Sequence, residues 1–433
     1  MKRKQYIMAA VSGVLLVGLA VFGICKIHYR QKITLEFGMF TGSNWDVAQA
    51  NGFTIIDKAI AKFEHAHPGV TVHYYSGIRK DDYSEWFSRK LLAGEEPDIF
   101  MVLGTDFNQF ASMGVMKDLE TFIEEPEKYF TSAFVSGQYE SVQYALPYET
   151  VPTLMFVNKT LLTQEGIDMP EENWTWDDFY EICKKVTRDT DGDGMLDQFG
   201  SYNYDWMDAL CSNGGGVFNK KGTEAALTDS RVVEAVKYVR SINDLYGGEK
   251  LTQEDFNGGR VAFMPLTFAE YRTYKTYPYK IRKYANFQWD CVTMPTGEQG
   301  GNISQVDSLL MGISANTKEE KLAWEFLKLL TYDEESQMNI FYDSQGASVL
   351  KEVTESQQME QVVQEDMEEG DTVINGKLLG RVIEEGHVEP QFKKDEQAMS
   401  LTDSEINKIL EEEKDVDSNL KILQRTINGY LIQ

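Results

Sequence analysis

A short acidic loop carries the most regular ligand spacing in the chain. Residues 189–194 read DTDGDG, and a further aspartate follows at Asp197. In an EF-hand calcium loop, alternating side chains such as Asp189, Asp191 and Asp193 point at one centre, and a glycine permits the sharp turn. Asp197 falls at the ninth position of such a loop, but Gly200 replaces the bidentate glutamate of the twelfth. The spacing leaves two interpretations open, a structural calcium site and an acidic turn without metal.

Signatures of catalysis are missing from the sequence. The five histidines are scattered, and no H-E-x-x-H, G-x-S-x-G or Walker pattern occurs. The run of Asn213 and three glycines lacks the Lys-Ser/Thr ending of a phosphate-binding loop, and its composition predicts a flexible loop over a cleft. These features favour a binding protein that requires no cofactor.

The first hundred residues show the alternation of an α/β sheet. Strand-like runs at 33–37, 70–74 and 97–102 are separated by segments with helical periodicity, in which Ile56, Ile60 and Phe63 recur about every fourth residue. Such a strand–helix order predicts parallel strands with right-handed crossovers.

Two side chains follow the ends of these strands. Trp45 comes after the first strand and Asp106 after the third. Ligands of open α/β sheets sit at this carboxyl edge. Aromatic rings stack on flat apolar faces, and carboxylates accept hydrogen bonds from hydroxyl groups. Both residues are therefore candidates for contact with a ligand at this edge of the sheet.

Residues 144–200 carry a family resemblance. An apolar stretch at 154–157 leads into Asn158-Lys159-Thr160, Thr175 and Asp178 start a helix with a capping box, and the acidic loop follows. This order resembles the extracellular solute-binding proteins of carbohydrate ABC importers, the family 1 or maltose-binding-like group. Similar elements occur at 255–264 (DFNGGRVAFM), at 287–295 (FQWDCVTMP), which resembles the strand that recrosses between lobes, and at 312–330, so that the resemblance covers residues 33 to 350.

The resemblance implies a two-lobed α/β fold of the periplasmic-binding-protein class II type, with discontinuous lobes joined by a hinge. The expected organisation is 1–32 as a membrane anchor or signal segment, 33–147 as lobe 1, 148–290 as lobe 2, 291–332 as a return to lobe 1, and 333–433 as a helical C-terminal part of lobe 2.

The resemblance also implies ligand-binding residues beyond Trp45 and Asp106. Tyr148 and Glu149 lie at the first crossing between lobes, where similar receptors place a ligand carboxylate. Trp206 matches a stacking aromatic of the second lobe. Phe268 stands where the family often has tryptophan, and Asp307 where many relatives have glycine. Each is expected to line the cleft, although a core or hinge role is the alternative for each.

The implied function is that of a receptor which binds a sugar or oligosaccharide between its lobes and delivers it to ABC permease subunits. One alternative is a secreted glycosidase with Asp205 and Asp208 as its acid pair. The other is a sensory binding module that feeds a membrane kinase.

The N-terminus predicts attachment to the cell membrane with the rest of the chain on the extracellular face. Nineteen residues without a charge, from Ile7 to Cys25, follow Lys2, Arg3 and Lys4. Such a run is typical of a membrane-spanning helix or a signal segment. An uncleaved helical anchor is the first interpretation, and a lipid attached at Cys25 is the second.

The net charge limits the possible binding partners, and the cysteine spacing limits the possible metal sites and disulfides. The net charge is −27, from 69 acidic and 42 basic residues, which excludes nucleic acid as a natural partner and disfavours anionic ligands. The four cysteines show no metal-binding spacing, and a Cys183–Cys211 disulfide is one pairing that the sequence allows.

Overall fold

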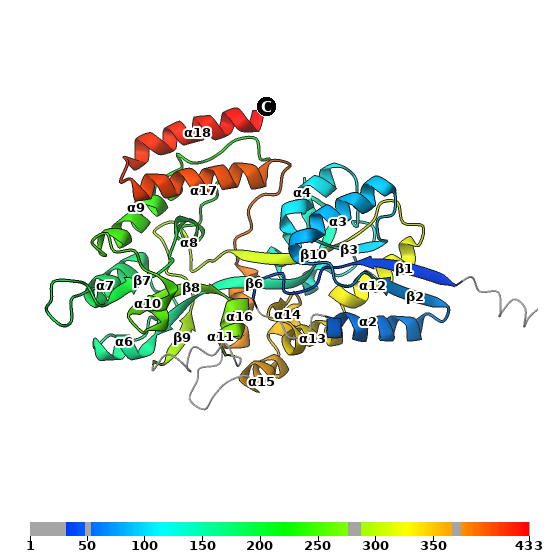
Figure 1. Cartoon of the computed structure of the whole chain (residues 1–433), viewed down its shortest axis with the longest axis horizontal. Coiled ribbons are helices and arrows are strands. Elements are labelled where there is room, and N and C mark those ends of the chain that lie inside the picture. The colour runs from blue at the N-terminus through cyan, green and yellow to red at the C-terminus, as the bar shows by residue number, and fades with distance from the viewer. Residues whose placement is uncertain (1–31, 48–52, 276–286, 366–373, 433) are drawn as a thin grey trace, which may run out of the picture.

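The computed structural model describes residues 32–47, 53–275, 287–365 and 374–432 (Figure 1). The predicted N-terminal anchor and Cys25 lie outside these ranges. Among the described residues, no helix combines the length and the apolar character needed to cross a bilayer.

Eleven strands are described, most of them in one continuous sheet. They are β1 (Ile33–Gly38), β2 (Val70–Tyr74), β3 (Ile99–Val102), β4 (Gln138–Tyr139), β5 (Val142–Gln143), β6 (Ala145–Asn158), β7 (Phe199–Ser201), β8 (Val261–Thr267), β9 (Trp289–Val292), β10 (Val306–Ile313) and β11 (Ala347–Ser348). The sheet order is β2-β1-β3-β10-β6-β8-β7, with β9 and β11 also paired to β6, while β4 and β5 form a separate hairpin. The predicted parallel pairing holds for β1 with β2 and with β3.

The helices cover this sheet in two groups. They are α2 (Phe53–Ala66), α3 (Lys80–Ala93), α4 (Gly104–Ser112), the 3₁₀ helix η1 (Pro126–Lys128), α5 (Thr131–Val135), α6 (Lys159–Gln164), α7 (Trp176–Val186), α8 (Trp206–Ser212), α9 (Ser230–Asp244), α10 (Gln253–Asn257), α11 (Phe268–Lys275), α12 (Glu320–Thr331), α13 (Glu334–Asp343), α14 (Lys351–Thr354), α15 (Gln357–Glu365), α16 (Gly376–Glu384), α17 (Asp395–Glu411) and α18 (Val416–Ile432). Figure 1 shows one group around β1–β3 and the other around β7 and β8, which we call lobe 1 and lobe 2.

Strand β6 joins the two lobes. Its first residues, from Ala145 to Pro152, pair with β10 in lobe 1, and the residues from Thr153 to Asn158 pair with β8 and β9 in lobe 2. Nearly all of its 14 residues are buried, because neighbouring elements cover both faces. The first crossing therefore lies within β6, where the pairing partner changes between Pro152 and Thr153.

The return to lobe 1 occurs later than the sequence predicted. Strand β9, expected to lead back at residue 291, pairs with Met155 to Asn158 of β6 and so belongs to lobe 2. The chain then makes a loop and enters lobe 1 along β10, whose first pair is Val306 with Pro152. The difference arises because β9 and β10 occupy successive parts of the same long strand, which no local pattern reveals.

The last change from lobe 1 to lobe 2 also occurs later in the chain than residue 333, where the sequence placed it. Helix α13, predicted to belong to lobe 2, packs on α2 of lobe 1. Lys58 and Asp343 form an ion pair of 2.7 Å across this contact, and Lys62 and Asp333 form another of 2.9 Å. The C-terminal helices α17 and α18 pack on each other and on α9, so only this later part joins lobe 2.

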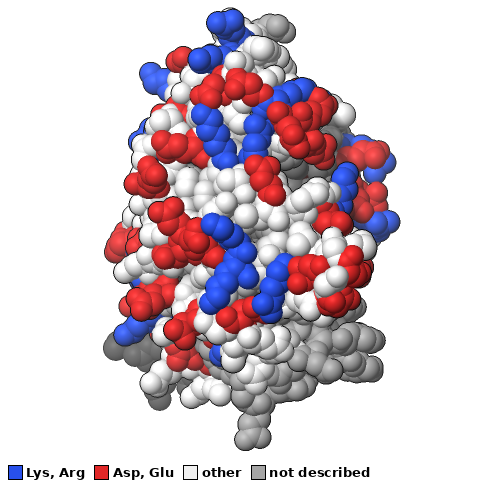
Figure 2. All heavy atoms as spheres, turned by 90° about the vertical axis from the view of Figure 1, so that its left-hand side faces the viewer, with Lys and Arg blue, Asp and Glu red and all other residues white. Residues whose placement is uncertain are grey.

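Buried clusters hold each lobe together. The cluster of lobe 1 gathers β1, α2, β3, β10 and α12, and a larger cluster fills lobe 2 and continues beneath the connecting strand. The predicted capping box of Thr175 and Asp178 is confirmed at the start of α7. On the end of the molecule in Figure 2, basic side chains lie between acidic ones, so this face offers no continuous basic surface to a phosphate backbone.

Candidate ligand-binding cleft

A cleft of about 690 Å³ lies between the two lobes. Lobe 1 contributes the loop after β1, the start of α4 and the beginning of β10, whereas the other wall comes from the loop before α9 and the segment between α16 and α17. The aromatic, charged and polar side chains that line it include Trp45, Asp46, Lys80, Phe107, Phe218, Asp307, His387, Glu389, Gln391, Asp395 and Glu396. Both the volume and the mixture of aromatic and polar groups are typical of a small-molecule site.

Trp45 is the partly exposed aromatic residue on the lobe 1 wall. It belongs to the loop after β1, and its indole Nε1 donates a 2.9 Å hydrogen bond to Glu149 Oε1. Lys80 fixes the same loop, because its Nζ donates to the carbonyl oxygen of Asn44 at 2.6 Å and to both carboxylate oxygens of Asp46 at 2.9 Å. Glu149 therefore holds the indole ring and Lys80 holds its loop, which reduces the conformational entropy lost when a ligand stacks on the ring.

Asp307 enters the cleft from the second residue of β10. Its side chain reaches solvent there, but the cleft walls limit its hydration and raise the pKa of the carboxyl group. Gln305 Nε2 donates a 3.3 Å hydrogen bond to Oδ1 and opposes that shift. The carboxylate keeps acceptor capacity for a ligand hydroxyl.

The segment between α16 and α17 was not among the predicted site residues, although it lines the cleft. His387 Nε2 lies 2.9 Å from Glu389 Oε1, and the backbone NH of His387 donates to the carbonyl oxygen of Ser304. Farther along, Gln391 Oε1 and Asp395 Oδ2 each accept a 2.7 Å hydrogen bond from Asn108 Nδ2 of α4. This segment links the two lobes along one side of the cleft. Its only sequence signal is an interruption of the helical pattern.

Asp106 stands beside the cleft without lining it. Its neighbours Thr105 and Phe107 line the cavity, while its own Oδ2 accepts a 2.6 Å hydrogen bond from Ser84 Oγ. Burial raises the pKa of this carboxyl group, and the bond from Ser84 opposes the shift. The carboxylate therefore braces the start of α4 against α3.

Three predicted contact residues are core residues instead. Tyr148 is 4% exposed in the lobe 1 cluster, and the side chains of Phe268 and Trp206 are fully buried in the larger cluster. Trp206 Nε1 donates a 2.8 Å hydrogen bond to Asp403 Oδ1 of α17. The predictions that these rings face the cleft are wrong in this structure, because helices α17 and α13, distant in the chain, cover α8 and α11.

Glu149 is also not a cleft residue. Its side chain is buried, and Oε1 accepts hydrogen bonds from Trp45 Nε1, from Ser344 Oγ and from the backbone NH of Gly346, the last two at 2.6 Å. Burial raises the pKa of the carboxyl group, while these bonds and the nearby Arg272 guanidinium oppose the shift. The residue ties the Trp45 loop to the crossing between lobes.

The acid pair of the glycosidase alternative caps a helix. Asp205 Oδ1 accepts hydrogen bonds from the backbone NH groups of Met207 and Asp208, and Asp208 Oδ2 accepts one from the backbone NH of Asp205. This reciprocal capping box satisfies the free NH groups at the start of α8. The three-residue spacing of Asp205 and Asp208 is thus that of a helix cap, and neither side chain lines the cleft.

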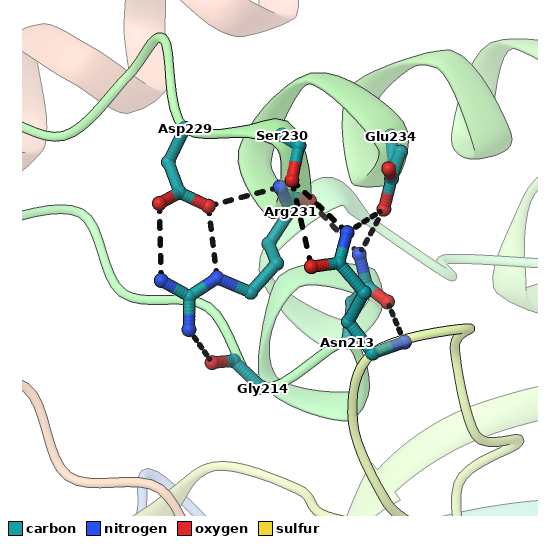
Figure 3. Close-up of polar contacts among 7 residues, drawn as sticks. Asn213, Gly214, Asp229, Ser230, Arg231 and Glu234 are labelled. Carbon is teal, nitrogen blue, oxygen red and sulfur yellow. Dashed lines mark hydrogen bonds and ion pairs between the residues drawn. The ribbon is translucent and has the colours of Figure 1, made fainter.

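The loop around Asn213 is firmly held, contrary to the prediction of a flexible loop (Figure 3). Asn213 is fully buried, and its Nδ2 donates to the carbonyl oxygen of Arg231 and to Glu234 Oε2. Arg231 Nη1 donates to the carbonyl oxygen of Gly214 at 2.9 Å, and the same guanidinium forms a bidentate pair with Asp229. The glycines therefore serve close packing.

The acidic loop brings three carboxylates together. Oxygens of Asp189, Asp191 and Asp197 lie within 4.8 Å of one another, whereas Asp193 is not part of this group and accepts from the backbone NH of Met195. Backbone NH groups of Gly194 and Gly192 lower the pKa of the Asp189 carboxyl group, so it is ionised at neutral pH. Oxygen ligands of this kind suit calcium.

The disulfide that the sequence allowed between Cys183 and Cys211 is not formed. Both residues are buried free thiols. Cys183 lies on the apolar face of α7, and a Cβ atom placed on Gly200 would come within 2.6 Å of its Sγ. The thiol is therefore part of the packing between α7 and β7.

Comparison with known proteins agrees with this architecture. A galactooligosaccharide-binding protein of Bacillus subtilis (strain 168) is 23% identical over 253 residues, which cover 56% of this chain and 58% of that relative. A substrate-binding protein of an ABC transporter from Listeria monocytogenes, solved in complex with cycloalternan, superposes with a TM-score of 0.67 at 20% identity, covering 93% of this chain and 99% of the other.

A second solved structure, the cyclic alpha-maltosyl-1,6-maltose binding protein from Arthrobacter globiformis, gives a TM-score of 0.75 at 16% identity, with 92% and 98% of the two chains covered. At such identities the superpositions establish a shared two-lobed fold. The family described as bacterial extracellular solute-binding protein matches residues 48–337, more than half of the sequence. The chain therefore belongs to the bacterial extracellular solute-binding proteins, a family of receptors and not of enzymes.

Proposed function

We propose that this protein captures an oligosaccharide between its lobes and delivers it to the permease of an ABC importer. The observation that carries the proposal is the interlobe cleft of about 690 Å³, which both Trp45 and Asp307 line. A sugar offers both a flat apolar face for the indole and hydroxyl groups for the carboxylate.

The site supports capture by closure. A saccharide that contacts both walls gains more free energy from the closed form than from an open one, and this difference shifts the equilibrium towards closure. Strands β6 and β10 are the paired connections that would bend. The Glu149 network lies at that crossing, and it connects the stacking residue to the hinge.

The names of the relatives favour an oligosaccharide over a monosaccharide. One is called a galactooligosaccharide-binding protein, and the two superposed structures are named for cycloalternan and for cyclic alpha-maltosyl-1,6-maltose. A cleft lined along several elements of both lobes offers room for more than one sugar ring.

A saccharide screen tests this function directly. The purified protein is melted in the presence of galacto-, malto- and cello-oligosaccharides and their monosaccharides, since a ligand of the folded state raises its melting temperature. We expect a rise with at least one oligosaccharide, which chromatography then recovers unaltered. Loss of uptake of that sugar after deletion of the gene would support the permease partnership. No shift with any saccharide would refute the proposal.

The N-terminal segment supports attachment to the outer face of the membrane. We propose either a retained apolar helix over Ile7 to Cys25 or a lipid at Cys25. Membrane fractionation of the wild type and of Cys25→Ala separates the two forms of attachment. Release of the variant into the soluble fraction identifies the lipid, and retention identifies the helix. A wild type that is itself released refutes both.

We also propose a structural calcium ion in the loop from Asp189 to Asp197. The three converging carboxylates support it, because like charges held this close repel unless a cation or hydrogen-bond donors offset them. Asp189, Asp191 and Asp197 would supply the ligands, and the ion would stiffen the connection between α7 and β7.

A further inference from the structure

The walls of the cleft are strongly acidic. Five of the described lining residues are Asp or Glu, namely Asp46, Asp307, Glu389, Asp395 and Glu396, whereas Lys80 is the one Lys or Arg among them. Lys80 is already committed, because its Nζ contacts both carboxylate oxygens of Asp46 at 2.9 Å. His387 Nε2 lies 2.9 Å from Glu389 Oε1. Among the described residues, no Lys or Arg forms an ion pair with Asp307, Asp395 or Glu396. The remaining charge of the cleft is therefore negative.

The polar atoms left without partners at this site are acceptors. Glu389 Oε2 and Asn108 Oδ1 are buried and have no hydrogen-bond partner among the described residues. Asn108 is 5% exposed and contacts the cleft residues Gln391 and Asp395 through its other amide atom. Asp307 receives one long bond from Gln305 among the described residues. A buried acceptor without a donor costs free energy, so the site favours a ligand that supplies donors.

Asp307 and Glu389 come from two segments that lie side by side along the cleft. Gln305 and His387 form a parallel bridge, and the backbone NH of Val306 donates to the carbonyl oxygen of His387 at 3.2 Å. Asp307 and Glu389 each follow a bridge residue by two positions, and both line the cleft. Their summed field attracts a cation and repels an anion, and the walls of a narrow cleft strengthen it.

We propose that the cleft selects a saccharide carrying a protonated amine, with the ammonium group held between Asp307 and Glu389. The inference deepens the proposed function and depends on it. An ammonium group supplies three donors and a positive charge, which meets both the unpaired acceptors and the uncompensated carboxylates. A neutral sugar supplies donors alone, and an acidic sugar adds repulsion.

Three tetrasaccharides of equal length test the proposal at pH 6, where sugar amines are protonated. They are the β-1,4-linked glucosamine tetramer, its N-acetylated form and cellotetraose. Isothermal titration should show the amine form binding about tenfold more tightly than either neutral form, with a preference that weakens as salt rises, because a screened charge pair contributes on this scale. Equal affinities, or no binding by any of the three when other sugars bind, would overturn the proposal.

Matched variants locate the preference. The double variant Asp307→Asn/Glu389→Gln should bring the affinities for the amine and neutral forms within about twofold of each other, because it removes the charge that separates them. The control Glu405→Gln/Asp417→Asn removes the same charge from exposed residues of α17 and α18 and should keep the full preference. If the double variant melts early, Asp307→Asn alone carries the test. A preference that survives either cleft variant would overturn the proposal.

The two hypotheses fail in different ways. If neutral oligosaccharides bind and the amine adds nothing, the receptor function stands and the selectivity is wrong. If no saccharide of any kind binds, the receptor function itself is wrong.

Discussion

The indole Nε1 of Trp45 donates a 2.9 Å hydrogen bond to Oε1 of Glu149, a residue 104 positions later in the chain. Glu149 was predicted to bind the ligand, yet it is buried and holds in place the aromatic ring that lines the cleft. The same oxygen accepts from Ser344 and Gly346, which follow α13. The ligand-facing wall is thus connected to the crossing between the lobes through one carboxylate.

Replacing Glu149 should destabilise the protein before it changes ligand chemistry. Glu149→Ala leaves three donors without their acceptor in a buried position, and we expect a loss of about 3 kcal/mol in the free energy of unfolding. Urea denaturation measures it. Glu149→Gln keeps an acceptor oxygen and should lose less. An unchanged urea midpoint for Glu149→Ala would show that the network contributes nothing.

Trp45→Ala should weaken ligand binding while folding stays cooperative. The ring is partly exposed, belongs to a loop and packs against the buried clusters from outside, so its removal keeps every member of those clusters. We expect a loss of about 1–3 kcal/mol in binding free energy, the scale of an aromatic anchor, measured by titration with the saccharide identified in the screen. Trp45→Phe retains a stacking surface and is the matched control. Equal affinity for wild type and Trp45→Ala would remove this residue from the site.

Trp206→Ala should reduce the stability of the fold rather than the affinity for the ligand. The side chain is fully buried, so its truncation leaves a cavity between α8 and α17 and should cost about 3–5 kcal/mol of stability. Denaturant unfolding gives the magnitude, and Trp206→Phe should lose less. A variant of wild-type stability with reduced sugar affinity would return Trp206 to the ligand site.

Calcium should stabilise the protein if the acidic loop is a metal site. After chelation, addition of calcium is expected to raise the melting temperature, because an ion that binds the folded state alone stabilises it by mass action. Asp189→Asn/Asp191→Asn should abolish the rise. Asp193→Asn is the matched control, since Asp193 is outside the converging group and should leave the response in place. An identical melt with and without calcium would eliminate the site.

Asp395 should make stability depend on pH. Burial raises the pKa of its carboxyl group to about 6, above the ordinary value of an aspartate. The folded state therefore keeps a proton that the unfolded state has lost, and stability falls as pH rises from about 4 to about 6. Above that range the charged carboxylate costs stability in full.

Asp395→Asn removes this cost. The variant should gain on the wild type by about 1 kcal/mol more at pH 7.5 than at pH 4.5, a figure reduced for the partial exposure of the side chain. Urea unfolding at both values measures the difference. Asp417→Asn, on an exposed face of α18, should show no comparable change with pH. A gain that is the same at both pH values would contradict the shift.

Local interactions account for what the sequence predicted correctly. The alternation of Val70, Val72 and Tyr74 identified β2, and the capping box of Thr175 and Asp178 is present because its partners are three residues apart. Thr317 and Glu320 have the same capping-box spacing at the start of α12. The Thr317 hydroxyl instead donates to Asp98 Oδ1, a residue 219 positions earlier, and α12 has no side-chain cap. A local rule is overridden when a distant acceptor lies closer.

The sequence by itself determined the strand–helix alternation of lobe 1 and strands such as β2, because strand ends and apolar periodicity are local properties of the chain, whereas the two-lobed organisation was implied by the resemblance to a known family. Tertiary structure alone decided which polar and aromatic residues reach the cleft. The segment from His387 to Glu396 lines it only because the chain changes lobe again after α13, and Trp206 is buried only because α17 folds back over α8. Burial depends on neighbours that are far away in sequence, so the same residue type can be a ligand contact or a core residue.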